Sequence, residues 1–279
     1  MKKILVFGSS GMLGDYFCNM LEQKGYEVIR NDKASGGIDI TDEQQVRDLV
    51  FETNPEYVIN CAAFTNVDLA EKERELAFSV NAKAPKYMAK ISKELEIPFI
   101  HVSTDYIFGE NKEEGYTEEY KNFKPLSVYG ESKLKGELNV LEENLNSYIF
   151  RTSWLFGPNA KNFVNKITEL AKERPHLNVV TDEVGCPTYV RDLSEGMLLA
   201  IDQKIEPGIY HVCSSDHLSR NEFAKEILRL QNLKTPIYEA KLDDFPREAK
   251  VPHFSVLLNT KLDEARSSSE MLEEYFKQS

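Results

Sequence analysis

Two tyrosines in this sequence are followed, four residues later, by a lysine, a spacing that places both side chains on one face of a helix. Lys124 precedes Pro125, and a residue before proline disfavours helical backbone, so Tyr120 is expected to be structural. Tyr129 opens the helix-forming run YGESKLKGELNVLEE, which places Lys133 beside it. An ammonium held there would lower the pKa of the phenol from about 10 towards neutrality. Tyr129 and Lys133 therefore predict the proton donor of a ketone reductase.

A further polar motif, Ser103-Thr104-Asp105-Tyr106, lies at the carboxyl end of the predicted strand IPFIHVST at 97–104. Ligands of open α/β sheets bind beyond the carboxyl ends of the strands. We therefore expect the Thr104 hydroxyl to hydrogen-bond a substrate carbonyl beside Tyr129 and to polarise it. Trp154, the only tryptophan, ends a later predicted strand, and both core packing and stacking on a substrate stay open for it.

A glycine-rich turn, GSSGMLG, directly follows the first predicted strand and opens a helix. A dinucleotide pyrophosphate needs a tight turn, a closely approaching backbone and the free N–H groups of a helix N-terminus. Gly8, Gly11 and Gly14 can supply each of these in turn. The spacing GxxGxxG is typical of dehydrogenases of the short-chain type.

The end of the second predicted strand indicates which dinucleotide binds. An acidic residue at this place hydrogen-bonds the ribose 2′-hydroxyl of NADH, whereas a cation favours the 2′-phosphate of NADPH. The sequence offers both, with Asp32 between Arg30 and Lys33. Because two cations flank one carboxylate, we expect NADPH, with NADH as the alternative.

Strands and helices alternate over the first 150 residues, which predicts right-handed crossovers and a Rossmann-type doubly wound parallel sheet. The expected strands are at 3–7, 26–30, 57–63, 97–104, 147–154 and 209–213. Beside the run that starts at Tyr129, helices are expected up to about 24 and near 43–53, 82–95, 161–173, 192–202, 220–231 and after 267. Thr41 with Gln44, and Ser267 with Glu270, are candidate capping boxes.

Two units are expected from this pattern. Residues 1–155, joined by roughly 190–216, would form the NADP-binding domain. Residues 156–189 and 217–279 would form a smaller, partly interleaved substrate lobe, because periodicity loosens beyond Trp154.

Composition excludes several classes of protein. The chain has 279 residues, of which 41% are hydrophobic, so it can bury a sizeable core. A net charge of −12 argues against nucleic acid or an anionic membrane as partner. No apolar run reaches the roughly 18 residues of a spanning helix, and Lys2 and Lys3 lead straight into a strand. Four scattered cysteines without CxxC spacing favour buried thiols in a cytoplasmic protein.

Several motifs follow one another in the order of a single family. The chain resembles the dTDP-4-dehydrorhamnose reductases, extended short-chain dehydrogenases of nucleotide-sugar metabolism. The resemblance extends from Ile4 to about Leu193 and is carried by GSSGMLG, CAAFTNVDLAE, Asn81-Ala82, VSTDYIF, YGESKLKGE, RTSWLFG, NFV and GCPTYVRDL.

The resemblance implies reduction of a 4-keto sugar by NADPH or NADH, and it implies roles for particular residues. Thr104, Tyr129 and Lys133 would be catalytic, and Thr104, Asp105 and Trp154 would contact the substrate, with Asn162 near the nucleotide. Phe64 replaces a polar residue often seen in the cofactor turn. The residues that would line the cofactor are Gly11, Met12, Leu13, Asp32, Asp39, Ile40, Ala62, Ala63 and Thr65.

One departure from the family concerns the substrate. Where the family usually carries an Arg-Pro pair, this chain has Lys250-Val251-Pro252. A lysine replaces the charge of the arginine but not its bidentate fork to phosphate. The expected reaction is dTDP-4-dehydro-L-rhamnose to dTDP-L-rhamnose, and a UDP-linked 2-acetamido-2,6-dideoxy-4-keto-hexose is the alternative substrate.

An alternative from another class is a non-catalytic NADP-binding regulatory subunit, as in methionine adenosyltransferase, whose regulatory subunit has this fold. Retention of Thr104, Tyr129 and Lys133 argues for the enzyme. Metal dependence and oligomeric state are left open, with a homodimer among the options.

Overall fold

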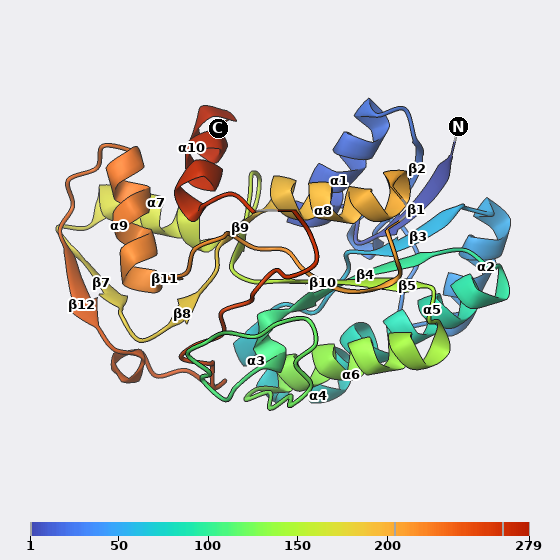
Figure 1. The fold of residues 1–279 in the computed structure, drawn as a ribbon, viewed down its shortest axis with the longest axis horizontal. Coiled ribbons are helices and arrows are strands. Elements are labelled where there is room, and N and C mark those ends of the chain that lie inside the picture. The colour runs from blue at the N-terminus through green and yellow to red at the C-terminus, as the bar shows by residue number, and fades with distance from the viewer. Residues whose placement is uncertain (1, 204, 264, 279) are drawn as a thin grey trace.

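A six-stranded parallel sheet forms the centre of the structure (Figure 1). The structure is a computed structural model, and it describes residues 2–203, 205–263 and 265–278. The six predicted strands are confirmed, and their order is β10-β5-β4-β3-β1-β2. From β1 the chain runs to β2 on one side and then to β3 on the other, so a switch point of the topology lies between β1 and β3. The strands are β1 (Lys3–Phe7), β2 (Glu27–Asn31), β3 (Tyr57–Asn60), β4 (Phe99–Thr104), β5 (Ser147–Thr152) and β10 (Gly208–His211).

Helices cover both faces of this sheet, because successive side chains of a buried strand point to opposite faces. In β1, Ile4 and Val6 belong to the core beneath α1 (Met12–Gln23) and α8 (Val190–Asp202). Leu5 and Phe7 belong to the core on the opposite face, against α2 (Glu43–Thr53), α5 (Ala84–Glu94) and α6 (Val128–Glu143).

The helix predicted at 82–95 has a more complex beginning. It is preceded by α3 (Val67–Lys72), α4 (Arg74–Phe78) and one π-helical turn at Ser79–Lys83. Short 3₁₀ turns occur at Lys33–Ser35, Asp105–Ile107 and Leu242–Asp244.

The two predicted capping boxes have different outcomes. The box at Thr41 is wrong, because the Asp42 side chain caps α2 by accepting hydrogen bonds from the backbone of Gln44 and Gln45. Asp42 stands one residue closer to the helix, so its carboxylate reaches the free N–H groups. The box formed by Ser267 and Glu270 is confirmed at the start of α10 (Ser268–Gln278).

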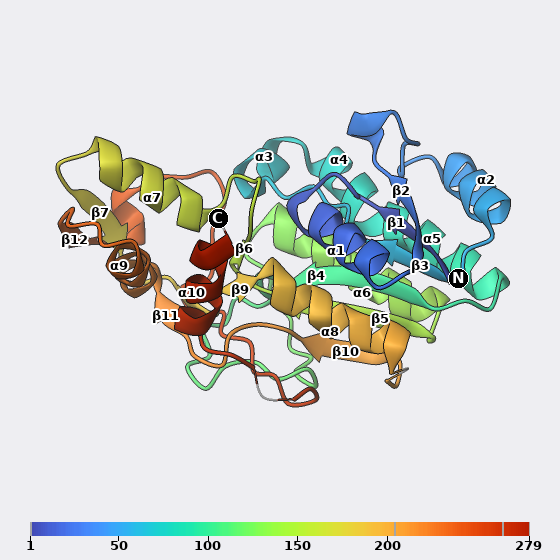
Figure 2. The same ribbon diagram turned by 90° about the horizontal axis from the view of Figure 1, so that it is seen from above.

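The remaining elements form a smaller lobe beside the carboxyl ends of the strands (Figure 2). It contains α7 (Phe163–Glu173), α9 (Arg220–Leu230) and α10, with the parallel pair β7 (Leu177–Val180) and β12 (Ile237–Ala240). Between them, α8 and β10 return to the large sheet, so the chain crosses from one unit to the other more than once. The division into domains stays a prediction. The short pairs are β8 (Val184–Gly185) with β11 (Leu218–Ser219), and β6 (Leu155–Phe156) with β9 (Thr188–Tyr189).

A single hydrophobic core connects the lobe to the sheet. Phe156, Tyr189 and Tyr275 pack ring against ring, and Phe223 of α9 joins the same cluster as Ile4 of β1. The lobe is therefore held by buried apolar contacts rather than by a flexible linker.

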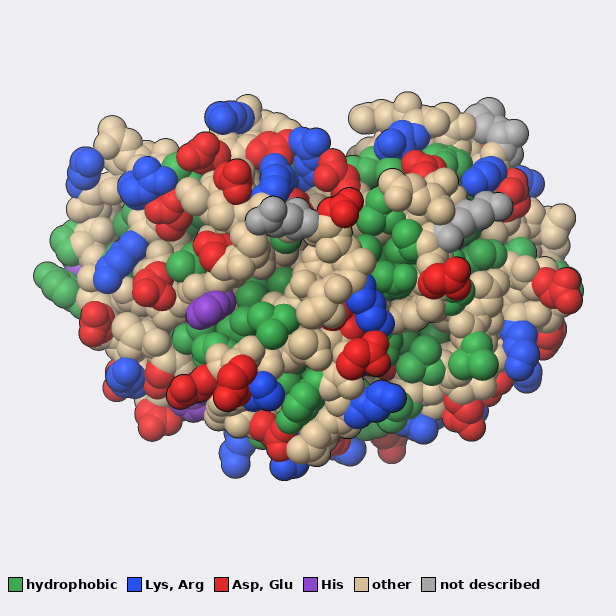
Figure 3. All heavy atoms as spheres, viewed as in Figure 1, with side chains coloured by type: hydrophobic (Ala, Val, Ile, Leu, Met, Phe, Trp, Pro, Cys, Tyr) green, Lys and Arg blue, Asp and Glu red, His purple; other side chains and the backbone are tan. Residues whose placement is uncertain are grey.

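Charged side chains of both signs are interspersed over the face drawn in Figure 3. None of the helices in the described part of the chain has the length and apolarity that a bilayer crossing needs. Among the described residues there is also no grouping of three or more His, Cys, Asp or Glu side chains that could hold a metal ion.

Candidate functional site

The glycine-rich turn brings the backbone of β1, α1 and β3 into direct contact. Gly8 has φ +76°, and a Cβ on it would lie 2.5 Å from the Ala62 backbone nitrogen. A Cβ on Gly14 would lie 2.1 Å from the Gly8 carbonyl oxygen. Gly11 precedes α1 as its N-cap without a side-chain hydrogen bond, so the N-terminus of this 12-residue helix keeps backbone donors for a ligand. The turn fits a pyrophosphate.

A cavity of about 670 Å³ opens at this turn and follows the carboxyl ends of the strands. It contains nearly all the residues that the sequence analysis singled out as cofactor or substrate ligands. The predicted residues that line it are Gly8, Gly11, Met12, Leu13, Gly14, Asp32, Ala62, Ala63, Thr65, Thr104, Asp105, Tyr129, Lys133 and Trp154.

Two further hydroxyl groups at the cavity are ready for a ligand. Ser103 and Thr152, on the neighbouring strands β4 and β5, line the cavity and are only 3% and 6% exposed. Neither hydroxyl has a hydrogen-bond partner within the described residues. Because a buried polar group without a partner is costly, these hydroxyls and the glycine cradle together fit a polar cofactor such as a nicotinamide dinucleotide.

Asp32, at the end of β2, lines the cavity, and its predicted contact with the ribose of the cofactor stays a prediction. Its carboxylate accepts hydrogen bonds from the backbone N–H groups of Ser10, at 3.4 Å, and Ala34, at 2.9 Å. The predicted role of Arg30 on a 2′-phosphate is not supported, because its guanidinium is bound to Glu22 and Asp15 of α1 and lies outside the cavity lining. The alternation of side chains along β2 turns Arg30 towards α1.

Lys33 and two of the predicted cofactor residues also lie outside the cavity lining. Asp39 accepts hydrogen bonds from Lys33 and Thr41, and these lower its pKa to about 2. Ile40 packs against the hydrophobic core beneath α2 and α5. A role of Asp39 or Ile40 as a cofactor ligand stays a prediction.

The tyrosine and lysine share one face of α6, as predicted, but the expected lowering of the tyrosine pKa is wrong for this structure. Burial raises the pKa of Tyr129 to about 12, and the nearby Asp105 carboxylate adds to this effect. Lys133 donates to the Val102 carbonyl at 2.6 Å, and its burial lowers the pKa of its ammonium to about 8. Tyr129 therefore holds its proton at neutral pH, although its pKa lies above the working pH at which a general acid is most efficient.

Thr104 and Asp105 form one hydrogen-bonded unit beneath the phenol. The Thr104 hydroxyl donates to Asp105 at 3.1 Å and lies within hydrogen-bonding reach of Tyr129. Asp105 is 1% exposed, and burial raises the pKa of its carboxyl to about 6. Because its carboxylate is engaged inside the protein, the predicted contact of this side chain with substrate stays untested.

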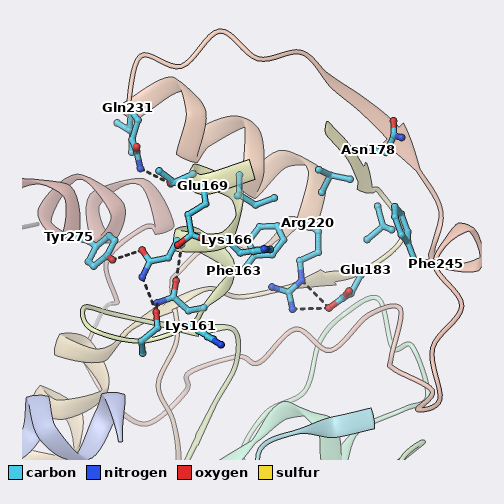
Figure 4. A pocket seen from close by; sticks show the side chains of 18 of the residues that line it. Lys161, Phe163, Lys166, Glu169, Asn178, Glu183, Arg220, Gln231, Phe245 and Tyr275 are labelled. Carbon is cyan, nitrogen blue, oxygen red and sulfur yellow. Dashed lines mark hydrogen bonds and ion pairs between the residues drawn. The ribbon is translucent and has the colours of Figure 1, made fainter. Parts of the chain in front are cut away.

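A second cavity, of about 1320 Å³, adjoins the first and lies between α7, α9 and the strand β7 (Figure 4). The two cavities share Tyr106, Ala160, Lys161 and Arg220 in their linings. Asn162 lines only the second cavity, and its side chain caps α7 and donates to the Gly157 carbonyl at 2.8 Å.

Arg220 occupies the junction between the cavities. Its guanidinium lies 3.6 Å from the ring centre of Trp154 and 4.9 Å from that of Phe163. It also donates to Glu183 at 2.8 Å, as Figure 4 shows. One face of Trp154 is therefore occupied by a cation, which restricts the stacking on substrate that the sequence left open.

Sequence reasoning did not single out Arg220 or Lys161, and it named Tyr106 only as part of the motif at 103–106, without a role. Arg220 follows a capping serine on a helix far along the chain, and this context is typical of a solvated helix start. No motif spacing links it to the glycine turn or to Tyr129, so only the folded chain places it at the cavity.

Known proteins match this chain over nearly its whole length. The family described as the RmlD substrate binding domain matches residues 1–277. The spore coat polysaccharide biosynthesis protein SpsK of Bacillus subtilis is 36% identical, over 100% of this chain and 98% of the length of SpsK. The dTDP-4-dehydrorhamnose reductase of Clostridium acetobutylicum is 38% identical, with a TM-score of 0.94 and 99% of both chains covered. That of Bacillus anthracis, solved in complex with NADP, is 35% identical, with a TM-score of 0.95 and 100% of both chains covered.

The fold and the site define an oxidoreductase of the extended short-chain dehydrogenase/reductase class, with a Rossmann sheet, a glycine turn at the first strand and a Tyr-x-x-x-Lys helix. The chain belongs to the dTDP-4-dehydrorhamnose reductase family. The resemblance drawn from the sequence motifs is confirmed.

Proposed function

We propose that this protein uses NADPH to reduce the C4 ketone of a nucleotide-linked 6-deoxy-4-keto sugar, converting dTDP-4-dehydro-L-rhamnose to dTDP-L-rhamnose. The observation that carries the proposal is the joint placement of Thr104, Tyr129 and Lys133 in the cavity that begins at the glycine turn. The names of the relatives, and the NADP bound in the Bacillus anthracis structure, support the choice of substrate and cofactor. We also propose that the protein acts in the cytoplasm, as the sequence analysis predicted.

Each residue of the catalytic set has a distinct task in the proposed reaction. The cofactor, when bound, supplies the hydride. The Tyr129 phenol, protonated at neutral pH, donates the proton to the developing alkoxide. The Lys133 ammonium places a positive charge within the buried site, where charge interactions are stronger than in water. Thr104 orients the phenol.

The nucleotide part of the substrate would occupy the second cavity. Its volume of about 1320 Å³ exceeds that of the first, and it opens to the catalytic residues through their shared lining. Lys161, Lys166, Arg220 and Arg247 contribute cations to its lining, which suits a diphosphate.

The test combines NADPH with a panel of dTDP-linked and UDP-linked 4-keto-6-deoxy sugars and follows the nicotinamide absorbance. Turnover of the dTDP-linked rhamnose precursor in preference to the UDP-linked sugars supports the proposal. Preference for a UDP-linked 2-acetamido sugar contradicts the choice of substrate. NADPH binding without turnover of any sugar favours the regulatory-subunit alternative.

Replacing Val251 by arginine restores the family's Arg-Pro pair and tests whether the diphosphate lies within its reach. Val251 is 7% exposed, so the guanidinium enters a buried place that is shaped for an apolar side chain. We expect V251R to leave the KM for the dTDP substrate unchanged or higher, with a lower melting temperature. The matched control is K250R, at the exposed neighbouring position. A tenfold drop in KM, worth about 1.4 kcal/mol, would show that the phosphate is in reach.

Asp32 provides a test of cofactor choice. Its carboxylate lines the cavity, whereas Arg30 is held by α1, so a 2′-phosphate meets a negative charge here. We expect D32A to shift the NADPH-to-NADH affinity ratio about fivefold towards NADPH, since the repulsion across water is about 1 kcal/mol. Fluorescence titration with both cofactors measures it, with D48A on the exposed face of α2 as a control for net charge. An unchanged ratio would mean that Asp32 does not face the 2′ position.

A further inference from the structure

Ser255 comes from a segment far along the chain and reaches the interior of the site. Its hydroxyl donates to the Asp105 carboxylate, with 2.5 Å between Ser255 Oγ and Asp105 Oδ2. Ser255 is 2% exposed and Asp105 is 1% exposed, so water cannot substitute for this bond without reorganising the protein around it. The bond is charge-assisted and is therefore among the stronger hydrogen bonds in proteins.

The other oxygen of the same carboxylate holds Thr104. Asp105 Oδ1 accepts from the Thr104 hydroxyl at 3.1 Å, and Thr104 in turn lies within hydrogen-bonding reach of Tyr129. Ser255, Asp105 and Thr104 thus form one continuous hydrogen-bonded chain, and Thr104 at its end interacts with Tyr129.

The backbone around Ser255 is fixed on both sides. Its own N–H donates to the Val184 carbonyl at 3.1 Å, which attaches it to β8 of the lobe. One residue later, the Val256 carbonyl accepts from the Tyr116 N–H at 2.9 Å. The hydroxyl therefore reaches Asp105 from a position that is set by the lobe and by the loop after β4.

We propose that Ser255 is a positioning residue for the reduction. It anchors the Asp105 carboxylate from the C-terminal segment 253–258 and, through that carboxylate, holds the Thr104 hydroxyl beside the Tyr129 phenol. The expected effect on kcat rests on the proposed function, whereas the arrangement of Ser255, Asp105 and Thr104 rests only on contacts within the protein.

The groups that face Asp105 set the sign of its response to pH. Arg220 of α9 favours the ionised carboxyl, while burial opposes it. Tyr106 and Tyr129 are neutral at working pH, since burial raises the pKa of each. Cys213 is neutral as well, because the hydrogen bond with Cys186 and burial both raise the pKa of its thiol. Because the pKa of Asp105 is about 6, its carboxylate becomes protonated as the pH falls through 6. The hydrogen bond from Ser255 lowers this pKa, so removing the bond makes the carboxylate protonate at a higher pH.

The experiment compares the wild-type protein with S255A by two readouts. Carbon NMR of the aspartate carboxyls, in the protein without ligands, is expected to show the Asp105 pKa raised by about one unit in S255A. The acid limb of the kcat profile is expected to move up by the same amount, with a loss in kcat of about threefold at pH 6.5 and unchanged affinity for NADPH. S255T, which keeps a hydroxyl on Cβ, is expected to return the limb towards that of the wild type.

S194A is the matched control, because Ser194 is equally buried and its hydroxyl donates to Val190 within α8 at 2.7 Å. It should lose stability without moving either readout, and a shift in S194A would reduce the effect to general destabilisation and overturn the inference. An unchanged Asp105 pKa in S255A overturns it too, even if S255A is partly unfolded, since the titration reports on the folded fraction.

D105N adds a variant without the titrating group, in which the acid limb near pH 6 should vanish. A wild-type protein that reduces none of the sugars overturns the proposed function, while an active S255A with an unmoved limb overturns the positioning role alone.

Discussion

Tyr129→Phe is expected to lower kcat by 10²–10⁴-fold while NADPH binding stays close to that of the wild type. The ring keeps its packing, including the edge-to-face contact with Tyr106 at 5.5 Å between centroids. Only the hydroxyl is lost, and a positioned proton donor contributes an effect of this size. Steady-state kinetics on the preferred sugar and fluorescence titration of NADPH give the two numbers.

Tyr120→Phe is the internal control for this prediction, since Tyr120 and Lys124 share the same spacing. The Tyr120 hydroxyl donates to Glu110, and its ring packs against Phe108 and Tyr116, outside both cavities. We expect kcat in this variant to stay within a factor of two of the wild type. Turnover like that of the wild type in Tyr129→Phe would remove Tyr129 from the mechanism.

Glu137→Gln is expected to reduce the free energy of unfolding by about 3–5 kcal/mol. Glu137 of α6 and Arg151 of β5 form an ion pair whose side chains are 2% and 0% exposed, with 2.7 Å between Arg151 Nη2 and Glu137 Oε2. Glutamine keeps the shape but leaves the guanidinium without a counter-charge in the interior. Urea denaturation followed by circular dichroism measures the loss.

The matched control on the same helix is Glu143→Gln. Glu143 pairs with Lys86 at 3.3 Å, but its side chain is 25% exposed, so we expect a change below about 1 kcal/mol. Equal losses in the two variants would mean that the buried pair adds nothing specific to stability.

Glu137→Gln is also expected to affect the active site, because Lys133 lies one turn before Glu137 on α6. The Glu137 carboxylate supports the charged form of Lys133 against burial. Without it the lysine pKa falls further below its usual range, so the ammonium is lost at lower pH. The alkaline limb of the kcat profile is therefore expected to move to lower pH in Glu137→Gln.

The sequence by itself determined the parts of this protein that depend on neighbours along the chain. The apolar run at 3–7 predicts a strand buried on both faces, because only such a run fits the centre of a parallel sheet. The glycines at 8 and 14 are required by close backbone approaches. The spacing of Tyr129 and Lys133 predicted their shared face of α6, and Pro125, which disfavours helical backbone at Lys124, argued against the Tyr120 pair.

Local signals failed where two neighbouring residues competed. Thr41 and Asp42 both suit an N-cap, and one residue of register decided for Asp42. Arg30 and Asp32 both suit the end of β2, and the acidic groups on α1 decided which of them faces the cavity. Side-chain partners contributed by another element are not encoded in the local pattern.

Only the tertiary structure decided the electrostatics of the site. Burial raises the pKa of Tyr129, whereas the spacing of the lysine alone had predicted the opposite direction. Ser255 reaches Asp105 across 150 positions of sequence, and Arg220 reaches Trp154 from a separate helix. Backbone sterics and hydrogen bonding fix local structure from adjacent residues. The pKa of a buried group depends on its desolvation and on nearby charges, and therefore on every segment that surrounds it. Those segments come together only when the lobe has packed against the sheet.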